Sequence, residues 1–364
     1  MDQTPAQRDA QGVSARGAHP LIKSAVLALL ALGAAAVLAA ISFDRDRPVA
    51  AGGLTFEYLA HHTIMRDDPD APGNHRPRFG GASGIDVLPG TLTRDGNTAT
   101  LRAAVVSDDR ARPTVHVVTI TFTRADDGDW SMHAEVTGEI GLRHRRRDAE
   151  SVVVLPSRDD HAWYAVSYEQ PPAIAVLRDP PRRPMRRRDG RPAPHLLHVP
   201  DEISRRVRTN RGFESLALRT TDDGATELWA ALESDLEGDG ATDERGATCR
   251  VLVYRVHDPE NITLDRQTEY VTEPLPDALL RIGRFNSLAD ATDLPDGSLA
   301  FLERSAAALG GYDATLFRVR ETEDIGHLDK TRLASVMEIA GNELPWVGNY
   351  EGVCLGPTIA DLTG

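Results

Sequence analysis

The chain has 364 residues, of which 41% are hydrophobic and 26% are charged, and its formal net charge is −14. This composition is typical of a folded protein with a large core and excludes a chain that is disordered by composition. The acidic balance argues against nucleic-acid binding, for which a basic surface would be expected. It is compatible with cation binding and with good solubility.

The N-terminal part of the chain contains one long apolar run. Residues 1–20 are polar and predicted to be disordered, and residues 21–43 form an apolar run whose only charge is Lys23. About 20 apolar residues suffice to cross a bilayer, whereas a secretory signal has an apolar core of about 7–15. We therefore expect a transmembrane signal anchor at 21–43 and a linker at 44–54. Small residues near Ala39 and Ala51 leave cleavage, and hence secretion, as the alternative; both place the remainder outside the cytoplasm.

From residue 55 onward the chain consists of short apolar runs separated by Gly, Pro and Asp turns. The first run, at residues 55–64, precedes the repeats described next. Short strands with this punctuation predict an all-β protein.

One short pattern recurs five times in residues 55–364. Its central residues are spaced 62 to 75 apart and are Gly84, Ser151, Ser215, Asp290 and Gly352. Self-similarity at such a period marks a repeat architecture. Each pattern is followed by a second apolar run that ends in a polar or acidic group, and then by a third and often a fourth run. Four strands per unit around an axis make a propeller blade. We expect a β-propeller-like domain of five or six four-stranded blades, with the last blade incomplete.

Glutamate stands directly before the central residue in three of the five patterns, as Glu150, Glu214 and Glu351. Residues at one register of a propeller project toward its axis, so these carboxylates are expected to meet at one mouth of the central channel. Like charges at close range disfavour ionisation, so each carboxylate must take up a proton or find a cation. Calcium prefers several oxygen ligands. The alternative for each glutamate is a structural role at a turn or strand start.

A second acidic segment has the spacing of a calcium loop. Its acids occupy positions 1, 3, 5 and 9, with glycine at position 6, and are Asp235, Glu237, Asp239 and Asp243. Alternate residues of such a loop turn oxygens inward. Gly246 stands where an EF-hand requires glutamate, so this segment is not an EF-hand. The alternative is an ordinary acidic turn.

Other common site types find little support in the sequence. Cys249 and Cys354 both fall within predicted strands, and either one disulfide or two buried thiols would fit. The twelve histidines lack zinc-ligand spacing. Ser83 is not in a Gly-x-Ser-x-Gly elbow, so a serine nucleophile is not indicated.

Several motifs taken together form a recognisable series, at residues 79–85, 107–110, 148–150, 210–214, 302–304 and 349–357. With this series, residues 55–364 resemble the phytase-like family, the domain described as "esterase-like activity of phytase". Ser151 and Ser215 depart from it, because glycine commonly follows the glutamate there. The resemblance implies a β-propeller-like fold exported by bacteria, and hydrolysis of phosphoric or other esters.

Two functions fit these observations. The first is an extracytoplasmic, cation-dependent hydrolase acting on a small-molecule ester or phosphate ester, helped by a carboxylate next to a calcium-activated water. Its calcium ligands would be Asp108, Glu150, Glu169, Glu214 and Glu351, and Arg110 and Arg304 would orient the phosphoryl oxygens. The second is a non-catalytic propeller, tethered to the membrane through residues 21–43, that binds a ligand or partner and uses the same acids for structural calcium. Fold alone does not separate them.

Overall fold

The computed structural model describes residues 49–51, 54–56, 59–60, 64, 81–108, 113–142, 148–159, 161–179, 195–239, 246–274, 285–306, 312–322, 326–340 and 351–358. The chain divides into two compact units, residues 1–45 and 46–364, and every described residue lies in the second. The apolar run expected to form an anchor at 21–43 lies outside the described residues. Within them, no helix is long and apolar enough to span a membrane.

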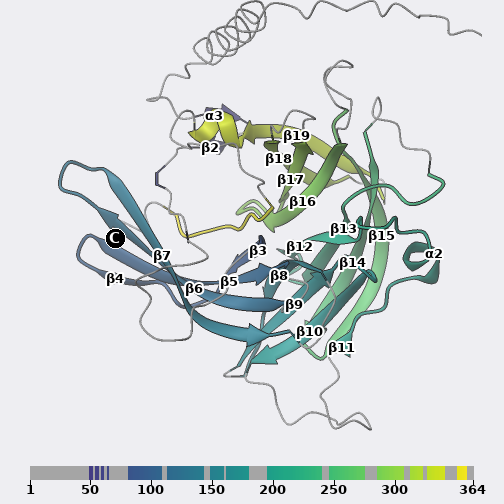
Figure 1. Ribbon diagram of the computed structural model, residues 1–364, viewed down its shortest axis with the longest axis horizontal. Helices are drawn as coiled ribbons and strands as arrows, with labels where there is room; N and C mark the ends of the chain where they lie inside the picture. Colours follow the sequence, from purple (N-terminus) through teal and green to yellow (C-terminus); the bar gives the residue numbers. More distant parts are fainter. Residues whose placement is uncertain are drawn as a thin grey trace, which may run out of the picture. The chain divides into compact units, whose positions relative to one another are not determined.

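Four antiparallel sheets of four or five strands follow one another along the chain and form the blades (Figure 1). The first blade contains β3 (Ala82–Val87), β5 (Thr98–Ser107), β6 (Thr114–Arg124) and β7 (Trp130–Gly141), with β4 (Thr93–Asp95) beside β5. The second contains β8 (Ala149–Leu155), β9 (Ala162–Tyr168), β10 (Ala173–Asp179) and β11 (His195–Leu196).

The third blade contains β12 (Phe213–Thr220), β13 (Thr226–Leu232), β14 (Thr248–Asp258) and β15 (Asn261–Val271). The fourth contains β16 (Phe285–Asp293), β17 (Leu299–Ala306), β18 (Tyr312–Glu321) and β19 (Leu328–Ser335). Helix in the described part is confined to α2 (Asp201–Ser204) and α3 (Val336–Ala340). A short hairpin of β1 (Val49–Ala51) and β2 (Leu54–Phe56) precedes the blades. The arrangement is a four-bladed β-propeller.

The prediction of an all-β propeller is confirmed, whereas the prediction of five or six blades is wrong. The fifth sequence pattern lies in residues 351–358, which in the described structure form an extended segment outside the four sheets. Its Val353 and Leu355 amides donate to Asp290 Oδ2 and Thr292 Oγ1 of β16, at 2.9 and 3.0 Å. On its other side, a Cβ on Gly352 would lie 3.3 Å from the Cα of Gly84 in β3. The pattern marks an inner segment, which need not carry a blade of its own.

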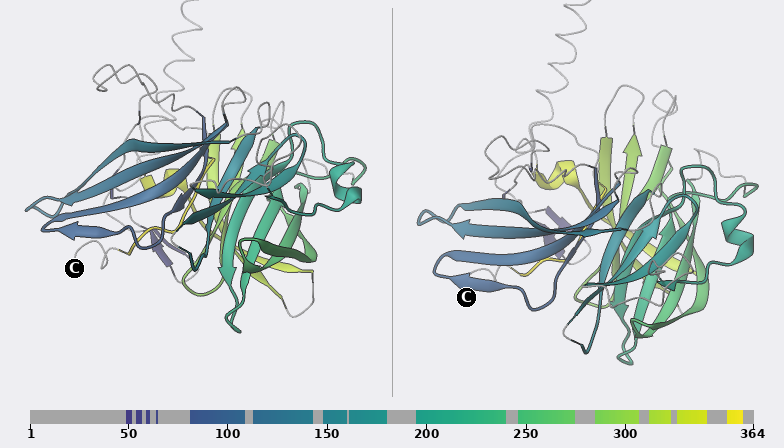
Figure 2. Two further views of the ribbon diagram at one scale, coloured as in Figure 1. Left: turned by 90° about the horizontal axis from the view of Figure 1, so that it is seen from below. Right: turned by 60° about the horizontal axis from the view of Figure 1, so that its bottom comes forward.

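The first strand of each blade is the innermost one. β3 contacts β8, β8 contacts β12, and β12 contacts β16, so the starts of the four sheets lie side by side (Figure 2). Every residue of β8 is buried, which explains its unbroken run Val152–Val153–Val154. A strand covered on both faces reads as continuously apolar rather than alternating.

Apolar side chains between neighbouring blades form the core. Val153, Ile174, Phe213 and Leu216 belong to the cluster between the second and third blades. A similar cluster between the third and fourth blades contains Trp229. Burial of each such side chain stabilises the folded state by about 1.5–3 kcal/mol relative to leaving it exposed. Contacts between neighbouring blades therefore contribute to the stability of the fold. Cys249 and Cys354 are free thiols.

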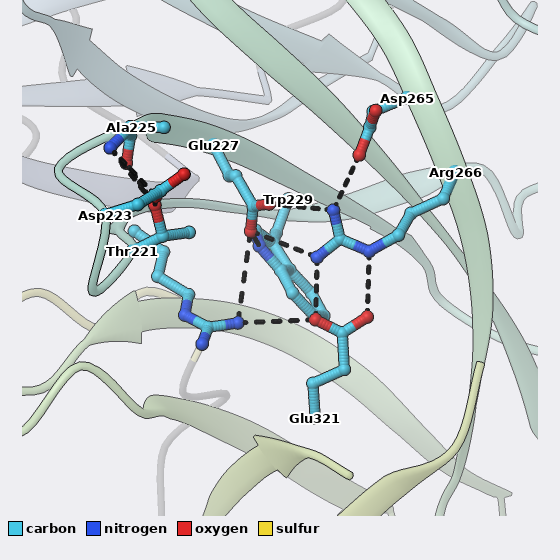
Figure 3. Close-up of polar contacts among 9 residues, drawn as sticks. Thr221, Asp223, Ala225, Glu227, Trp229, Asp265, Arg266 and Glu321 are labelled. Atoms are coloured by element: carbon cyan, nitrogen blue, oxygen red, sulfur yellow. Dashed lines mark hydrogen bonds and ion pairs between the residues drawn. The ribbon is translucent and has the colours of Figure 1, made fainter. Parts of the chain in front are cut away.

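Charged side chains also join the third and fourth blades (Figure 3). Arg266 Nε donates to Glu321 Oε1 at 2.8 Å, and Arg266 Nη1 donates to Glu227 Oε1 at 2.7 Å. The Trp229 indole donates to the same Glu227 carboxylate at 3.0 Å. Although burial opposes ionisation, these donors hold the pKa of Glu227 below its ordinary value. This buried acid is fully compensated by its partners.

Candidate functional site

A β-bulge interrupts the pairing of the first and second strands at the same place in all four blades. In the third blade Phe213 pairs with Leu232 and Ser215 with Ala231, so Glu214 is the extra residue. Equivalent interruptions occur in the other three blades. The residues within the four bulges include Ser83, Glu150, Glu214 and Ala289. A bulge redirects a side chain out of the alternation of the strand. This geometry is the physical basis of the repeated glutamate position.

The second strand of each blade leads into a charged residue beside the bulge. These residues are Asp108, Glu169, Glu233 and Arg304 in the four blades. In the first three blades the amide of this residue donates to the carbonyl of Gly81, Asp148 or Gly212, at 2.8 to 2.9 Å. The same backbone bond therefore places three acids at equivalent positions, and the fourth blade contributes an arginine instead.

Asp148, Glu150 and Glu169 form the first acid group. Each offers a carboxylate oxygen, and these oxygens lie within 4.8 Å of one another. The three residues are 8%, 7% and 4% exposed. Burial raises the pKa of Glu150 to about 9, and Asp148, Glu169, Glu351 and Asp108 contribute to the rise. The charges acting most strongly on Glu150 are all negative, so at neutral pH it holds a proton unless a cation replaces that proton.

Glu169, Glu214 and Glu233 form the second acid group, which meets the same 4.8 Å criterion and shares Glu169 with the first. Arg211 Nη1 donates to Glu233 Oε1 at 2.6 Å, and Arg304 Nη2 lies 3.5 Å from the same oxygen. Burial raises the pKa of Glu233 and, more strongly, that of Glu214, while Arg304 opposes both rises. Two arginines thus supply positive charge to this group.

Glu351 connects the segment 351–358 to two blades. Arg304 Nη1 of the fourth blade donates to Glu351 Oε1, and Ser83 Oγ of the first blade donates to Oε2 at 3.3 Å. Arg304 is 8% exposed and lies between Glu351 and Glu233. Its guanidinium therefore fixes the positions of two site carboxylates.

Glycine allows the backbone of the third blade to approach the site closely. A Cβ on Gly212 would lie 2.2 Å from the carbonyl oxygen of Glu169. Only a residue without a Cβ fits there. The contact brings Glu169 close to Glu214 and Glu233.

The structure brings together the five residues predicted from sequence as metal ligands at the channel mouth. Asp108, Glu169 and Glu351 all act on the pKa of Glu150, and Glu150 acts on that of Glu214. Sequence reasoning missed two site residues, Asp148 and Glu233. Glu233 ends the second run of its unit as Asp108 and Glu169 end theirs, so register was an available signal. Arg110 lies outside the described residues.

The predicted separate calcium loop contains carboxylates that face arginines. Arg208 Nη2 donates to Asp235 Oδ2 at 2.8 Å. Asp239 accepts from Arg206 and, at 2.8 Å, from Arg250 Nη2. The Glu237 amide donates to the Arg206 carbonyl at 2.7 Å, and Asp243 lies outside the described residues. These guanidinium groups supply the positive charge that the prediction assigned to calcium, which favours the alternative of an ion-paired acidic turn.

Fold and site together define a β-propeller with a buried acidic site at its inner strands. The chain belongs to the phytase-like family, because the family model described as "Phytase-like: Esterase-like activity of phytase" matches residues 77–363. This confirms the family predicted from the motifs.

Among solved structures, one similar to the chain is a GH43 glycoside hydrolase whose engineered active site gives both endo-xylanase and exo-arabinofuranosidase activity. The sequence identity is 15% and the TM-score is 0.35. The match covers 71% of this chain and 41% of that chain, so it spans less than half of the other protein. No curated protein matches the sequence.

Proposed function

We propose that the protein is a cation-dependent hydrolase of phosphoric or other esters, with calcium held by Asp148, Glu150 and Glu169. One observation carries the proposal: three buried carboxylates lie within 4.8 Å of one another, and the charges acting most strongly on Glu150 are negative. Membership of a family described by esterase-like activity supports ester hydrolysis.

The donor set fits calcium better than a softer metal. All three groups offer carboxylate oxygen, the ligand type that hard cations such as calcium and magnesium prefer. Glu214, Glu351 and Asp108 lie near enough to act on this group or on each other electrostatically. When bound, such a cation polarises an ester oxygen and lowers the pKa of a coordinated water.

The chain's own residues take three roles in this proposal. Glu214, whose pKa burial raises well above its ordinary value, holds a proton and serves as the acid or base for proton transfer. Arg304 holds Glu351 and Glu233 in place and stabilises negative charge on the substrate. Arg110, which follows Asp108 by two residues, is proposed to orient the anionic part of the substrate.

The proposed location is outside the cytoplasm. The apolar run at residues 21–43 supports an anchored domain, or a secreted one if that run is cleaved. A small-molecule ester available in that compartment is the proposed substrate.

The test is hydrolysis of p-nitrophenyl phosphate and p-nitrophenyl acetate by the full chain in detergent, with calcium and with a chelator. We expect turnover that the chelator removes and calcium restores, and that Glu150→Gln loses. Asp239→Asn is the matched control, because it changes an ion-paired acid of the 235–239 turn and should keep activity. Turnover that survives both the chelator and Glu150→Gln would contradict the proposal. Calcium binding without turnover of either ester would favour the non-catalytic ligand-binding propeller.

A further inference from the structure

Asp290 occupies the central position of the fourth repeat, where the preceding residue is Ala289 rather than glutamate. It is 1% exposed, and both of its oxygens accept hydrogen bonds. Ser151 Oγ of β8 donates to Asp290 Oδ1 at 2.8 Å, and the Val353 amide donates to Oδ2 at 2.9 Å. One carboxylate thus joins the second blade, the fourth blade and the segment 351–358.

Ser151 extends this contact to the third blade. Its hydroxyl accepts the Leu216 amide of β12 at 3.1 Å, and its own amide donates to Ser167 Oγ at 2.9 Å. Ser151 and Asp290 belong to blades that are separated by the third, so their hydrogen bond bridges two non-adjacent inner strands. Both side chains are buried, and the channel predicted from sequence is therefore filled at this level.

Each backbone contact falls beside one of the repeated glutamates. Ser151 follows Glu150 directly, Leu216 is two residues beyond Glu214, and Val353 is two residues beyond Glu351. We propose that Asp290 is a positioning residue that, with Ser151, fixes the relative placement of Glu150, Glu214 and Glu351. Its consequence for cation binding rests on the proposed function above.

The fourth repeat thereby contributes to the arrangement of the site although it lacks the glutamate. Ala289 contributes no carboxylate to the site. The next residue, Asp290, is hydrogen-bonded directly or through Ser151 to all three segments that carry the glutamates. A hydrogen bond to a buried carboxylate is among the stronger kinds in proteins. The arrangement therefore fixes the backbones of the three glutamates, in addition to the contacts that the Glu351 side chain makes with Arg304 and Ser83.

The chain offers matched controls for both members of this pair. Asp86 of β3 is a half-buried acid that also joins inner strands: its Oδ2 accepts the Val154 amide of β8 at 2.7 Å, four residues from Glu150. Ser215 is the counterpart of Ser151 in the next repeat, equally buried, and its hydroxyl has no hydrogen-bond partner among the residues that the structure describes. Asp86→Asn and Ser215→Ala therefore change similar groups without touching the proposed connection.

The experiment compares Asp290→Asn with Asp86→Asn and Ser151→Ala with Ser215→Ala in the full chain. Crystal structures report the separations of the Glu150, Glu214 and Glu351 carboxylates, and titration calorimetry with calcium reports affinity. We expect Asp290→Asn and Ser151→Ala to separate the carboxylates and to weaken calcium binding about 10–100-fold, as loss of outer-shell partners does at metal sites. The two control variants should retain wild-type positions and affinity.

Wild-type carboxylate positions in Asp290→Asn or Ser151→Ala would overturn the positioning role, as would equal displacements in the control variants. If Asp290→Asn does not fold, the serine pair decides by the same criteria. If the wild-type protein binds no calcium but Asp290→Asn and Ser151→Ala still displace the glutamates, the proposed function fails and the positioning role stands.

Discussion

The two acid groups of the site contain the same kinds of residues but differ in the charges that act most strongly on Glu150 and on Glu214. In the group of Asp148, Glu150 and Glu169, the charges acting most strongly on Glu150 are negative, and burial raises the pKa of this residue to about 9. The group of Glu169, Glu214 and Glu233 has Arg211 and Arg304 beside it. A cluster of buried acids therefore does not by itself identify a cation site; the source of the neutralising charge does.

The origin of this difference lies in the fourth blade. At the register where the first three blades place Asp108, Glu169 and Glu233, the fourth places Arg304. That single exchange supplies an internal cation to the half of the site nearest the fourth blade.

Removal of the internal cation should have the largest effect. Arg304→Met leaves the buried Glu233 and the half-buried Glu351 without this partner, and loss of one partner from a buried ion pair costs about 3–5 kcal/mol. We expect a loss of that size in urea unfolding, partly recovered by added calcium, which can then also bind at the group of Glu169, Glu214 and Glu233.

The control for that change is Arg206→Met, which removes one of the two arginine partners of Asp239 at a site where the Arg206 side chain is 42% exposed. An ion pair of that exposure contributes about 1 kcal/mol or less. Equal losses in the two variants, or no extra recovery of Arg304→Met by calcium, would contradict the proposed division of charge.

Removing one carboxylate from each acid group should weaken calcium binding by different amounts. Glu150→Gln is expected to weaken binding roughly a hundredfold or more, beyond the range typical of outer-shell changes. Glu214→Gln should weaken it by about tenfold or less, because its group already has arginine partners. Titration calorimetry measures both, and equal losses would show that the two groups do not differ as cation sites.

The close backbone approach at Gly212 gives a smaller expected effect. Gly212→Ala places a Cβ against the Glu169 carbonyl, and such overpacking costs about 1–3 kcal/mol. It should also shift Glu169, which both groups share, and so weaken calcium binding. Gly141→Ala is the control, since a Cβ there meets no atom within 4 Å. If Gly212→Ala and Gly141→Ala have the same thermal stability and the same calcium affinity, this packing role is contradicted.

The most gradual effect is the dependence of stability on pH. Between the ordinary glutamate pKa and about 9, the folded protein binds more protons at Glu150 than the unfolded chain does. The free energy of unfolding without calcium should therefore fall as pH rises through that window, by at most about 1.4 kcal/mol per pH unit from this group, and level off above it. Glu150→Gln should flatten the slope. A slope of the opposite sign, unchanged in the variant, would contradict the assignment.

The fold and much of the site could be predicted from sequence because both follow the repeat. Glu150, Glu214 and Glu351 occur at one register, and the structure brings all three to the inner strands. Asp108 and Glu169 were found by the same logic at the ends of second strands. The blade number was overestimated because the fifth repeat marks only an inner segment, which lies between β16 and β3.

What the sequence did not reveal depends on contacts between distant segments. The arginines beside Asp235 and Asp239 come from positions 206, 208 and 250, so the local calcium-loop spacing gave no sign of them. The bond between Ser151 and Asp290 joins residues two repeats apart. The bulges that orient the glutamates depend on strand register, which the sequence pattern alone does not specify.

The position of calcium in a crystal of the full chain, located by its anomalous signal, tests the central claim most directly. We expect one site whose ligands are oxygens of Asp148, Glu150 and Glu169, at about 2.3–2.6 Å. A calcium ion between Glu214 and Glu233 instead, or an empty first group in crystals grown at saturating calcium, would contradict the claim.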